Sequence, residues 1–451
     1  MNDFSDDSVT IEAKPDAAKA VVRAGVTTPA PAAAMSVETR TSWVVAVAAL
    51  VTMAFSFGGP WVAVVSLKAI AADFGGARSV PALAGSLGWI GVGVGGILMG
   101  RIAERVGVRA TVMFGAAMIC TGLAVSSLGE PWQLLVGHGL FIGLLGNGGI
   151  NAPLYVYVSK WFDRRRGSAL ALISSGTYVA GAVWPPLFER AAAMIGWQQT
   201  MWWFGLIEMA VILPIAALTL GPPPQLPRLH GAALTEARRR RVLGWPPNLV
   251  HFMLCAAAFL CCVAMALPQA HLVAFCSDLG IAPSHGAAML SVLLGCAFVS
   301  RQFWGWVSDR IGGLRTVLAG SSCQIVAMTG FLLTRNEAAL FAVASFFGLG
   351  FSGMVPAYVL AVRELFPASE AARRIPVLLL FSGSGMAAGG WLAGLIYDHF
   401  GFYGAAFATG LLFNLVNLVV VAGLVLRQRR RLGSAFATLS GGTRGRPIKD
   451  W

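Results

Sequence analysis

The sequence predicts an all-α membrane protein in which twelve transmembrane helices form two pseudo-symmetric six-helix bundles. Charged residues make up 12% of the 451-residue chain and apolar residues 57%, so one globular domain could not hide its apolar surface from water. The loops Gly100–Arg109 and Gly305–Arg315 repeat each other, since each has an acid, an Arg and a Gly at matching offsets. A second repeat keeps the spacing of a Ser, an Ala and a Gly: Ser174, Ala180 and Gly181 return as Ser382, Ala388 and Gly389.

Twelve apolar stretches are long enough to cross a bilayer, which takes about 20 residues of α-helix. Gly is frequent within them, and small residues let helices approach closely in lipid. We expect the spans at 43–66, 80–100, 110–129, 132–158, 168–188, 199–220, 249–275, 285–307, 316–334, 338–361, 375–397 and 403–426.

The remaining segments divide the chain. Residues 1–40 are rich in Ala, Pro and Asp and lack the basic start and apolar centre of a signal peptide, which predicts a disordered cytoplasmic tail. Residues 41–220 should form the N-terminal bundle and residues 248–427 the C-terminal bundle. Between them, residues 221–247 contain clusters of Pro and Arg that do not fit hydrocarbon, so we expect a central cytoplasmic loop. Residues 428–451 are expected to be a basic cytoplasmic tail.

The net charge of +13 describes the topology of the chain rather than a nucleic-acid partner. The even-numbered connections between spans hold most of the loop Lys and Arg residues, whereas the odd-numbered ones hold Lys68, Arg78, Arg190 and Arg335. Because basic loops tend to stay in the cytoplasm, we expect both termini there. The chain is predicted to be a multi-pass protein of a bacterial inner membrane.

The sequence contains no pattern typical of an enzyme or a metal site. Its seven Cys lie in or next to spans, without CxxC or Cys/His ligand spacing. It has no HExxH, no GxSxG and no phosphate-binding loop, so we expect neither an enzyme nor a cofactor. A membrane chain of two similar halves usually binds a substrate between them and moves one half against the other. Transport is therefore the leading hypothesis.

Two charged residues lie well inside predicted spans, where charge is costly and usually functional: Arg301 and Glu208. Helical side chains lean toward the helix N-terminus, so the guanidinium of Arg301 should reach toward the membrane centre. A guanidinium can bind a carboxylate through two parallel hydrogen bonds. The alternative is that Arg301 snorkels to cytoplasmic water. For Glu208, a proton-carrying role and a structural role in the protonated form both stay open.

Other polar side chains could complete a binding site. Asn147 and Asn151 lie four residues apart, hence on one helix face, and either bind the substrate or join two helices. Gln269 and His271 lie near the outer part of their span, where a His could carry a proton near neutral pH.

Several segments match a known pattern: the two repeated loops, the run Lys160–Ala169, Phe55–Pro60 in the first span, His271–Phe275 with Asp278–Ile281, and Ser300–Trp306. In these segments the chain resembles the major facilitator superfamily. Within it, the chain is similar to the branch of monocarboxylate-transporter-like proteins and oxalate–formate exchangers. The resemblance covers nearly all of 41–430 and implies that superfamily's twelve-helix fold. It also places Arg301 where the branch has its substrate-binding arginine.

The resemblance implies roles for further residues. Aromatic side chains on the spans that line the superfamily's cavity either contact substrate or pack within the bundles: Phe57, Trp61, Tyr178 and Phe351, with Tyr155 and Tyr358. In the repeated loops, an acid can pair with an Arg and with a helix N-terminus and so latch the halves. We expect a gating role for Glu104, Arg105, Asp309, Arg310, Lys160 and Arg164.

Departures from the branch narrow the substrate. Trp61 stands where many animal members have a Lys, Ala297 stands where they have an Asp, and 375–397 has no Lys or Arg to match the oxalate exchanger's second cation. With one cavity cation, a monoanion is better matched than a dianion. We therefore predict a secondary active transporter that moves a small organic monocarboxylate by rocker-switch alternating access, with Arg301 as its ligand and protons as a candidate coupling ion. The alternatives are another cargo, by dicarboxylate exchange or by drug or sugar export, and a membrane sensor that does not transport.

Overall fold

The computed structural model describes residues 38–162, 165–222 and 242–441, and these residues are almost entirely helical. The helices are α2 (Arg40–Ser56), α3 (Pro60–Val65), α4 (Leu67–Asp73), α5 (Ser79–Val106), α6 (Val108–Ser126), α7 (Pro131–Val136), the π-helix η1 (Gly137–Asn147), α8 (Gly148–Ser159), α9 (Arg166–Ser174), α10 (Gly176–Thr219), α11 (Pro247–Asp278), α12 (Pro283–Ile311), α13 (Gly313–Leu333), α14 (Glu337–Phe351), α15 (Met354–Leu365), α16 (Ala368–Phe400) and α17 (Tyr403–Gly441). The predicted tail 1–40 and the predicted loop 221–247 lie mostly outside the described residues.

Among the described residues, eleven helices are long and apolar enough to cross a membrane. The longest, Ser168–Thr219, has 52 residues and is broken at Gly196, where φ is 81° and ψ is 161°. The ring of Phe204 lies 4.8 Å from the rings of both Trp184 and Phe188, so the chain folds back on itself at the break. This helix therefore supplies two spans. The prediction of an all-α membrane protein with twelve transmembrane helices is confirmed.

The two repeated loops have the same backbone conformation. Helix α5 ends at Gly107 with φ 88° and ψ 153°, and α12 ends at Gly312 with φ 84° and ψ 161°. In both places the next helix starts at once. Residues with a side chain are strained in this region of backbone space, which explains why Gly recurs at this offset.

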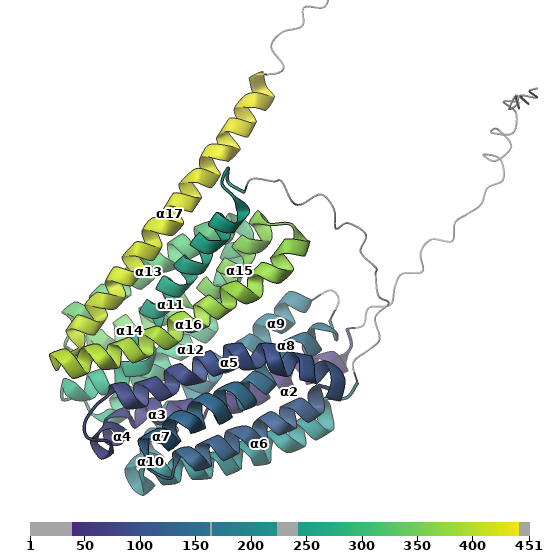
Figure 1. Ribbon diagram of the computed structural model, residues 1–451. Helices are drawn as coiled ribbons and strands as arrows, with labels where there is room; N and C mark the ends of the chain where they lie inside the picture. The colour runs from purple at the N-terminus through teal and green to yellow at the C-terminus, as the bar shows by residue number, and fades with distance from the viewer. Residues whose placement is uncertain (1–37, 163–164, 223–241, 442–451) are drawn as a thin grey trace, which may run out of the picture. The chain divides into compact units, whose positions relative to one another are not determined.

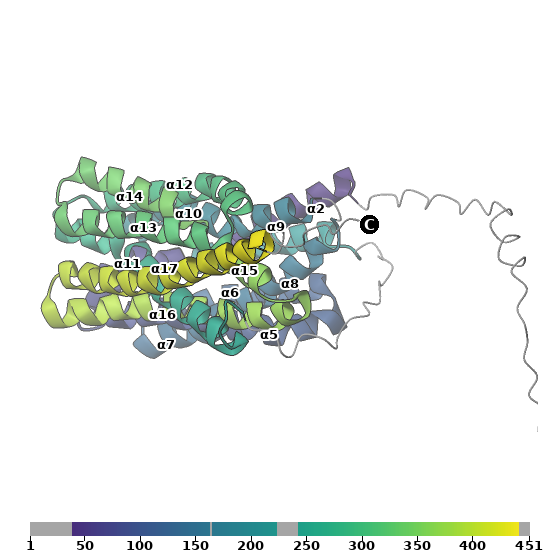
Figure 2. The same ribbon diagram turned by 90° about the horizontal axis from the view of Figure 1, so that it is seen from above.

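Each half of the chain has its own apolar core. One core is built from residues of α2 to α10, with Met53 and Ile119 fully buried, and the other mainly from α11 to α17, with Phe331 and Phe407 fully buried. In Figure 1 the purple-to-blue helices of the first half lie together beside the green-to-yellow helices of the second. The helices of both halves run roughly side by side (Figure 2), and the halves touch where α5 packs on α16 and α10 packs on α12.

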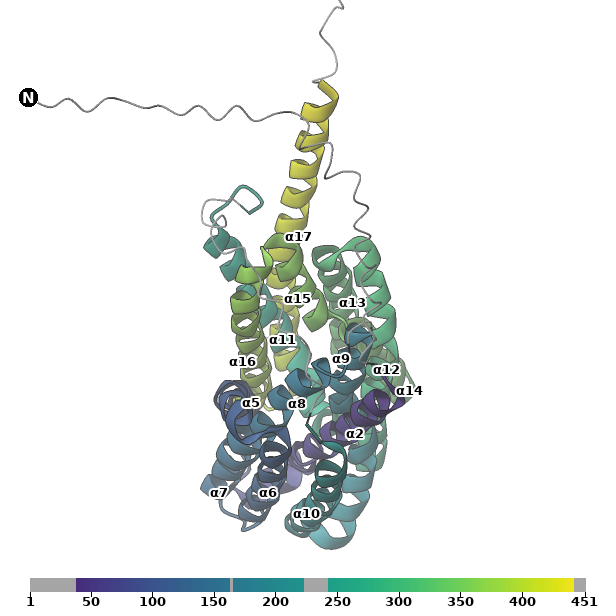
Figure 3. The ribbon, with the colours of Figure 1, turned by 90° about the vertical axis from the view of Figure 1, so that its right-hand side faces the viewer.

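Several spans are interrupted. The first breaks at Phe57–Gly59 between α2 and α3, the tenth breaks at Ser352–Gly353 between α14 and α15, and the fourth changes from α7 to η1 and then to α8. A π-helical segment of this kind is rare and is often found at a functional site. Helix α17 extends beyond its neighbours (Figure 3) and continues to Gly441, so the beginning of the predicted tail 428–451 is helical.

Candidate functional site

A cavity of about 140 Å³ lies between the two halves. Its walls come from α3, α4, α5, η1 and α10 on one side and from α11, α12 and α16 on the other. The walls are mostly apolar and aromatic, and their polar side chains are Ser86, His138, Asn147, Thr177, Tyr178 and Gln269, with the indoles of Trp61 and Trp89. A cavity between two similar halves is a position in which transporters bind their substrates.

Five of the predicted site residues line this cavity: Phe57, Trp61, Asn147, Tyr178 and Gln269. Phe57 lies in the break between α2 and α3 and packs against Trp89 of α5, whereas Trp61 on α3 packs against the cores of both halves. The side-chain nitrogen of Gln269 donates to the carbonyl oxygen of Met265 at 3.1 Å. Asn147 is 1% exposed, and its Oδ1 has no hydrogen-bond partner among the described residues.

Arg301 lies directly behind the cavity wall. Its guanidinium carbon is 5.1 Å from the centre of the Tyr178 ring, and Tyr178 also meets Phe351 edge-on at 5.9 Å. The Arg301 side chain is half-buried, and no carboxylate of the described residues forms an ion pair with it. A cation in the membrane interior without a counter-ion can bind an anion, and this cation contacts Tyr178, which lines the cavity.

Besides Arg301, three predicted residues lie outside the cavity wall. Phe351 is buried in the second core and reaches the site through Tyr178. Asn151 is partly buried, and its Oδ1 has no partner within the described chain. His271 is 1% exposed and hydrogen-bonded through both ring nitrogens, with Nε2 at 2.8 Å from the carbonyl oxygen of Gly390 and Nδ1 at 3.0 Å from the Tyr403 hydroxyl.

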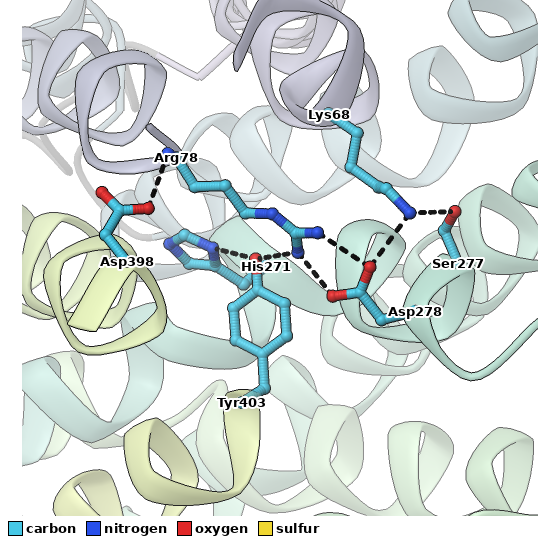
Figure 4. Close-up of polar contacts among 7 residues, drawn as sticks. All are labelled: Lys68, Arg78, His271, Ser277, Asp278, Asp398 and Tyr403. Carbon is cyan, nitrogen blue, oxygen red and sulfur yellow. Dashed lines mark hydrogen bonds and ion pairs between the residues drawn. The ribbon is translucent and has the colours of Figure 1, made fainter. Parts of the chain in front are cut away.

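Charged and polar side chains join the two halves at one end of the bundle (Figure 4). Arg78, just before α5, donates to both carboxylate oxygens of Asp278 at the end of α11, at 2.6 and 2.8 Å, and to the Tyr403 hydroxyl at 3.0 Å. Lys68 forms an ion pair with the same Asp278 carboxylate at 2.9 Å. The carboxylate of Asp398 accepts from the backbone nitrogen of Arg78 at 2.8 Å. We call Lys68, Arg78, Asp278, Asp398 and Tyr403 the Arg78 cluster.

Arg78 is held tightly in this cluster. It is 7% exposed, and its guanidinium stacks on Tyr397 at 3.7 Å from the ring centre. Burial opposes the charged form, but the bonds to Asp278 and Tyr403 outweigh burial and raise the pKa of Arg78 above its ordinary value. No sequence pattern links Arg78 with Asp278, which lie 200 positions apart. The one feature of the sequence that could have indicated Arg78 is that it is among the few cations in the odd-numbered loops.

The predicted gating residues lie at the other end of the bundle. Five of them are exposed: Glu104, Arg105, Asp309, Arg310 and Lys160. Arg164 lies outside the described residues. The acid that contacts a helix N-terminus here is Glu364, which accepts from the backbone nitrogen of Gly313 at 3.0 Å. Within the described chain neither Glu104 nor Asp309 has an ion pair, and their gating role stays a prediction.

Two further residues bear on the site. His138 on η1 lines the cavity, although no pattern in the sequence singles it out. Glu208 on α10 is fully buried, does not line the cavity, and neither of its carboxylate oxygens has a partner in the described chain.

Known proteins with similar sequences are transporters of one superfamily. The Major Facilitator Superfamily profile matches residues 45–336 and 255–445. Monocarboxylate transporter 13 of Rattus norvegicus is 25% identical over 72% of this chain and 74% of its own length. An uncharacterized MFS-type transporter of Bacillus subtilis is 24% identical over 64% of this chain and 72% of its own length.

Solved structures share the fold. A peptide transporter POT in complex with sulfate has a TM-score of 0.64 at 14% identity, with 84% of this chain and 94% of that chain covered. An inward-facing, unoccupied bacterial homolog of the human lysosomal transporter Spinster has a TM-score of 0.62 at 18% identity, with 86% and 96% covered. Because the family profile spans both halves of the chain, this protein belongs to the Major Facilitator Superfamily and is a membrane transporter.

Proposed function

We propose that this transporter moves a small organic monocarboxylate by alternating access, with Arg301 as the ligand of the carboxylate. The observation that carries the proposal is the position of Arg301, without a described counter-ion, behind Tyr178 at the cavity between the halves. We propose that the Tyr178 ring moves aside when a carboxylate in the cavity binds the guanidinium. The likeness to monocarboxylate transporter 13 supports the same class of cargo.

The cavity favours a small anion with an apolar body. Its volume of about 140 Å³ is below the roughly 300–1,000 Å³ of sites for drug-sized ligands. No Lys or Arg belongs to the described wall, so Arg301 would meet one carboxylate without help from a second cation. This charge balance suits a monoanion better than a dianion.

For alternating access, we propose that the Arg78 cluster closes one end of the cavity and breaks when that end opens. The distribution of Lys and Arg over the loops supports an extracytoplasmic position for this end, with both termini in the cytoplasm of a bacterial cell. The acid–Arg loops of Glu104 and Asp309 would then pair at the cytoplasmic end in the opposite conformation. The sequence contains no nucleotide-binding motif that would couple transport to ATP hydrolysis. A proton gradient is therefore the first energy source to test.

The test is uptake of labelled lactate, pyruvate, formate, oxalate and a branched-chain acid into proteoliposomes, with and without an inward proton gradient. Arg301→Gln should lower uptake of the transported acid by about 10- to 100-fold, since a hydrogen bond to a charged group contributes roughly 1.5–3 kcal/mol. Arg335→Gln, an exposed loop substitution, is the matched control and should leave uptake unchanged. Uptake that does not depend on Arg301, or competition by amines or sugars instead of acids, would refute the proposal.

A further inference from the structure

We infer that the cavity contains a subsite for a hydrogen-bond donor, formed by His138 Nε2 and Asn147 Oδ1, so that the preferred acid carries an O–H or N–H group. This inference rests on the proposed function, because Arg301 would hold the carboxylate of the same molecule. Both residues line the cavity on η1, both are 1% exposed, and each has one polar atom without a hydrogen-bond partner among the described residues.

The contacts of His138 fix which of its ring nitrogens can accept. Its Nδ1 lies 3.1 Å from the carbonyl oxygen of Leu134 and 3.0 Å from the Ser126 hydroxyl. A carbonyl oxygen can only accept, so the Nδ1 of His138 carries the proton and donates it to Leu134. In the neutral ring the Nε2 atom is then a lone-pair acceptor, as is the Oδ1 of Asn147. At this place, the cavity wall therefore offers two acceptors and is complementary to a donor.

The π-helix brings the two acceptors to one face. The segment from His138 to Asn147 would make about two and a half turns of an α-helix at about 3.6 residues per turn, which puts its ends on opposite faces. With the wider i→i+5 turn of a π-helix, at about 4.4 residues per turn, it makes about two full turns. The wall residues of η1 follow this period, since His138, Ile142, Gly143 and Asn147 all line the cavity.

Close packing holds η1 in place. A Cβ added at Gly91 of α5 would lie 2.5 Å from the carbonyl oxygen of Gly139, and one added at Gly122 of α6 would lie 2.7 Å from that of Gly137. Helices α5 and α6 thus touch η1 backbone to backbone on two sides. A wall fixed in this way presents its acceptors without prior rearrangement, and rigid placement favours selective binding.

Buried acceptors without partners make the site selective. A substrate with a donor forms hydrogen bonds with these acceptors. An analogue without a donor leaves the acceptors unpaired, so it binds without the free energy of those hydrogen bonds. A hydroxy or amino acid should therefore be preferred over the matched keto or unsubstituted acid by at least about tenfold in uptake efficiency. Hydroxy acids and amino acids differ in net charge, so comparing the uptake of one of each shows which class the site binds.

The experiment uses the full-length chain in proteoliposomes and a size-matched set: lactate, alanine, pyruvate and propionate. Wild type should prefer lactate or alanine by at least about tenfold. Asn147→Leu, which keeps the branching of the side chain and removes the acceptor, should reduce that preference to near unity. Asn151→Leu is the matched control, because Asn151 also has an unpartnered Oδ1 but lies outside the cavity wall, and it should keep the preference.

The outcomes separate the two proposals. Arg301-dependent uptake with no preference for a donor, or a preference that Asn147→Leu retains, would overturn the donor subsite alone. Preference for pyruvate would also overturn it, because a keto oxygen accepts and calls for a donor in the wall. Uptake of none of these acids would overturn both the subsite and the monocarboxylate proposal. Thermal unfolding of the purified variant shows whether Asn147→Leu folds. If it does not fold, the preference of the wild-type protein for acids with a donor still tests the subsite.

Discussion

The Arg78 cluster predicts that Asp278→Asn shifts the transporter toward the conformation that is open at this end. The Arg78 side chain is 8% exposed and that of Asp278 is 24% exposed, so their pair is only partly screened by water. Losing one partner of a buried pair costs roughly 3–5 kcal/mol, and a hydrogen bond to a charged group contributes roughly 1.5–3 kcal/mol. Asn still offers one acceptor, and Asp398 still holds the backbone of Arg78, so we expect about 2 kcal/mol, or about a 30-fold shift in the equilibrium.

A single cysteine in the cavity reports this shift. Gly85 lines the cavity and a Cβ added there meets no atom within 4 Å, so Gly85→Cys fits without strain. In a chain whose seven native Cys are replaced, an impermeant maleimide added on the Arg78 side should label the introduced thiol faster in the Asp278→Asn background, by up to about 30-fold.

The control for this prediction is Glu337→Gln. Glu337 forms an ion pair with His285 at 2.7 Å, but both residues belong to the second half, so breaking the pair should not change labelling. If Asp278→Asn folds normally and labels at the wild-type rate, the Arg78 cluster does not hold that end closed.

Two further predictions concern stability. Gly196→Ala should lower the free energy of unfolding by about 1–3 kcal/mol, because φ 81° and ψ 161° strain any residue with a side chain. The control is Gly100→Ala, which should not lower the free energy of unfolding, because Gly100 is helical and an added Cβ meets open space. Equal melting temperatures of the two variants would contradict the strain argument. Glu208→Leu should raise the free energy of unfolding by about 1–2 kcal/mol and keep uptake, because it removes a buried carboxyl group without hydrogen-bond partners in the described chain. Loss of uptake or of its pH dependence in that variant would instead place Glu208 in proton coupling.

The fold could be predicted because it depends on local patterns. Each predicted span falls in a helical segment, because apolar length largely decides whether a segment can cross a bilayer. Gly107 and Gly312 occupy matching positions in the repeated loops, because both positions require a backbone conformation with positive φ. The structure adds where helices extend past the predicted spans: α5 reaches Val106, whereas the predicted span ended at residue 100.

The site could be predicted only in part, because it depends on contacts between distant residues. Trp61 and Tyr178, which line the cavity, were candidates because the family resemblance places their spans at a cavity, and Asn147 was a candidate because it shares a helix face with Asn151. His138 could not be identified, because an α-helical spacing sets it opposite Asn147, and nothing in the composition predicts a π-helix there. The cluster of Arg78 and Asp278 could not be identified either, because both residues look like ordinary loop charges until the halves meet.

The hydrogen bonds of His271 run in one direction. The carbonyl oxygen of Gly390, in the cavity wall, can only accept, so Nε2 of His271 donates to it, Nδ1 accepts from the Tyr403 hydroxyl, and the Tyr403 oxygen accepts from Arg78. This polarity leaves no lone pair free on the imidazole. A proton on Nδ1 would therefore require the Tyr403 hydroxyl hydrogen to point elsewhere, because the hydroxyl oxygen would then accept from both Nδ1 and Arg78. A proton on His271 and the charge on Arg78 would then share one oxygen acceptor, so the Tyr403 hydroxyl links this histidine to the residues that join the two halves.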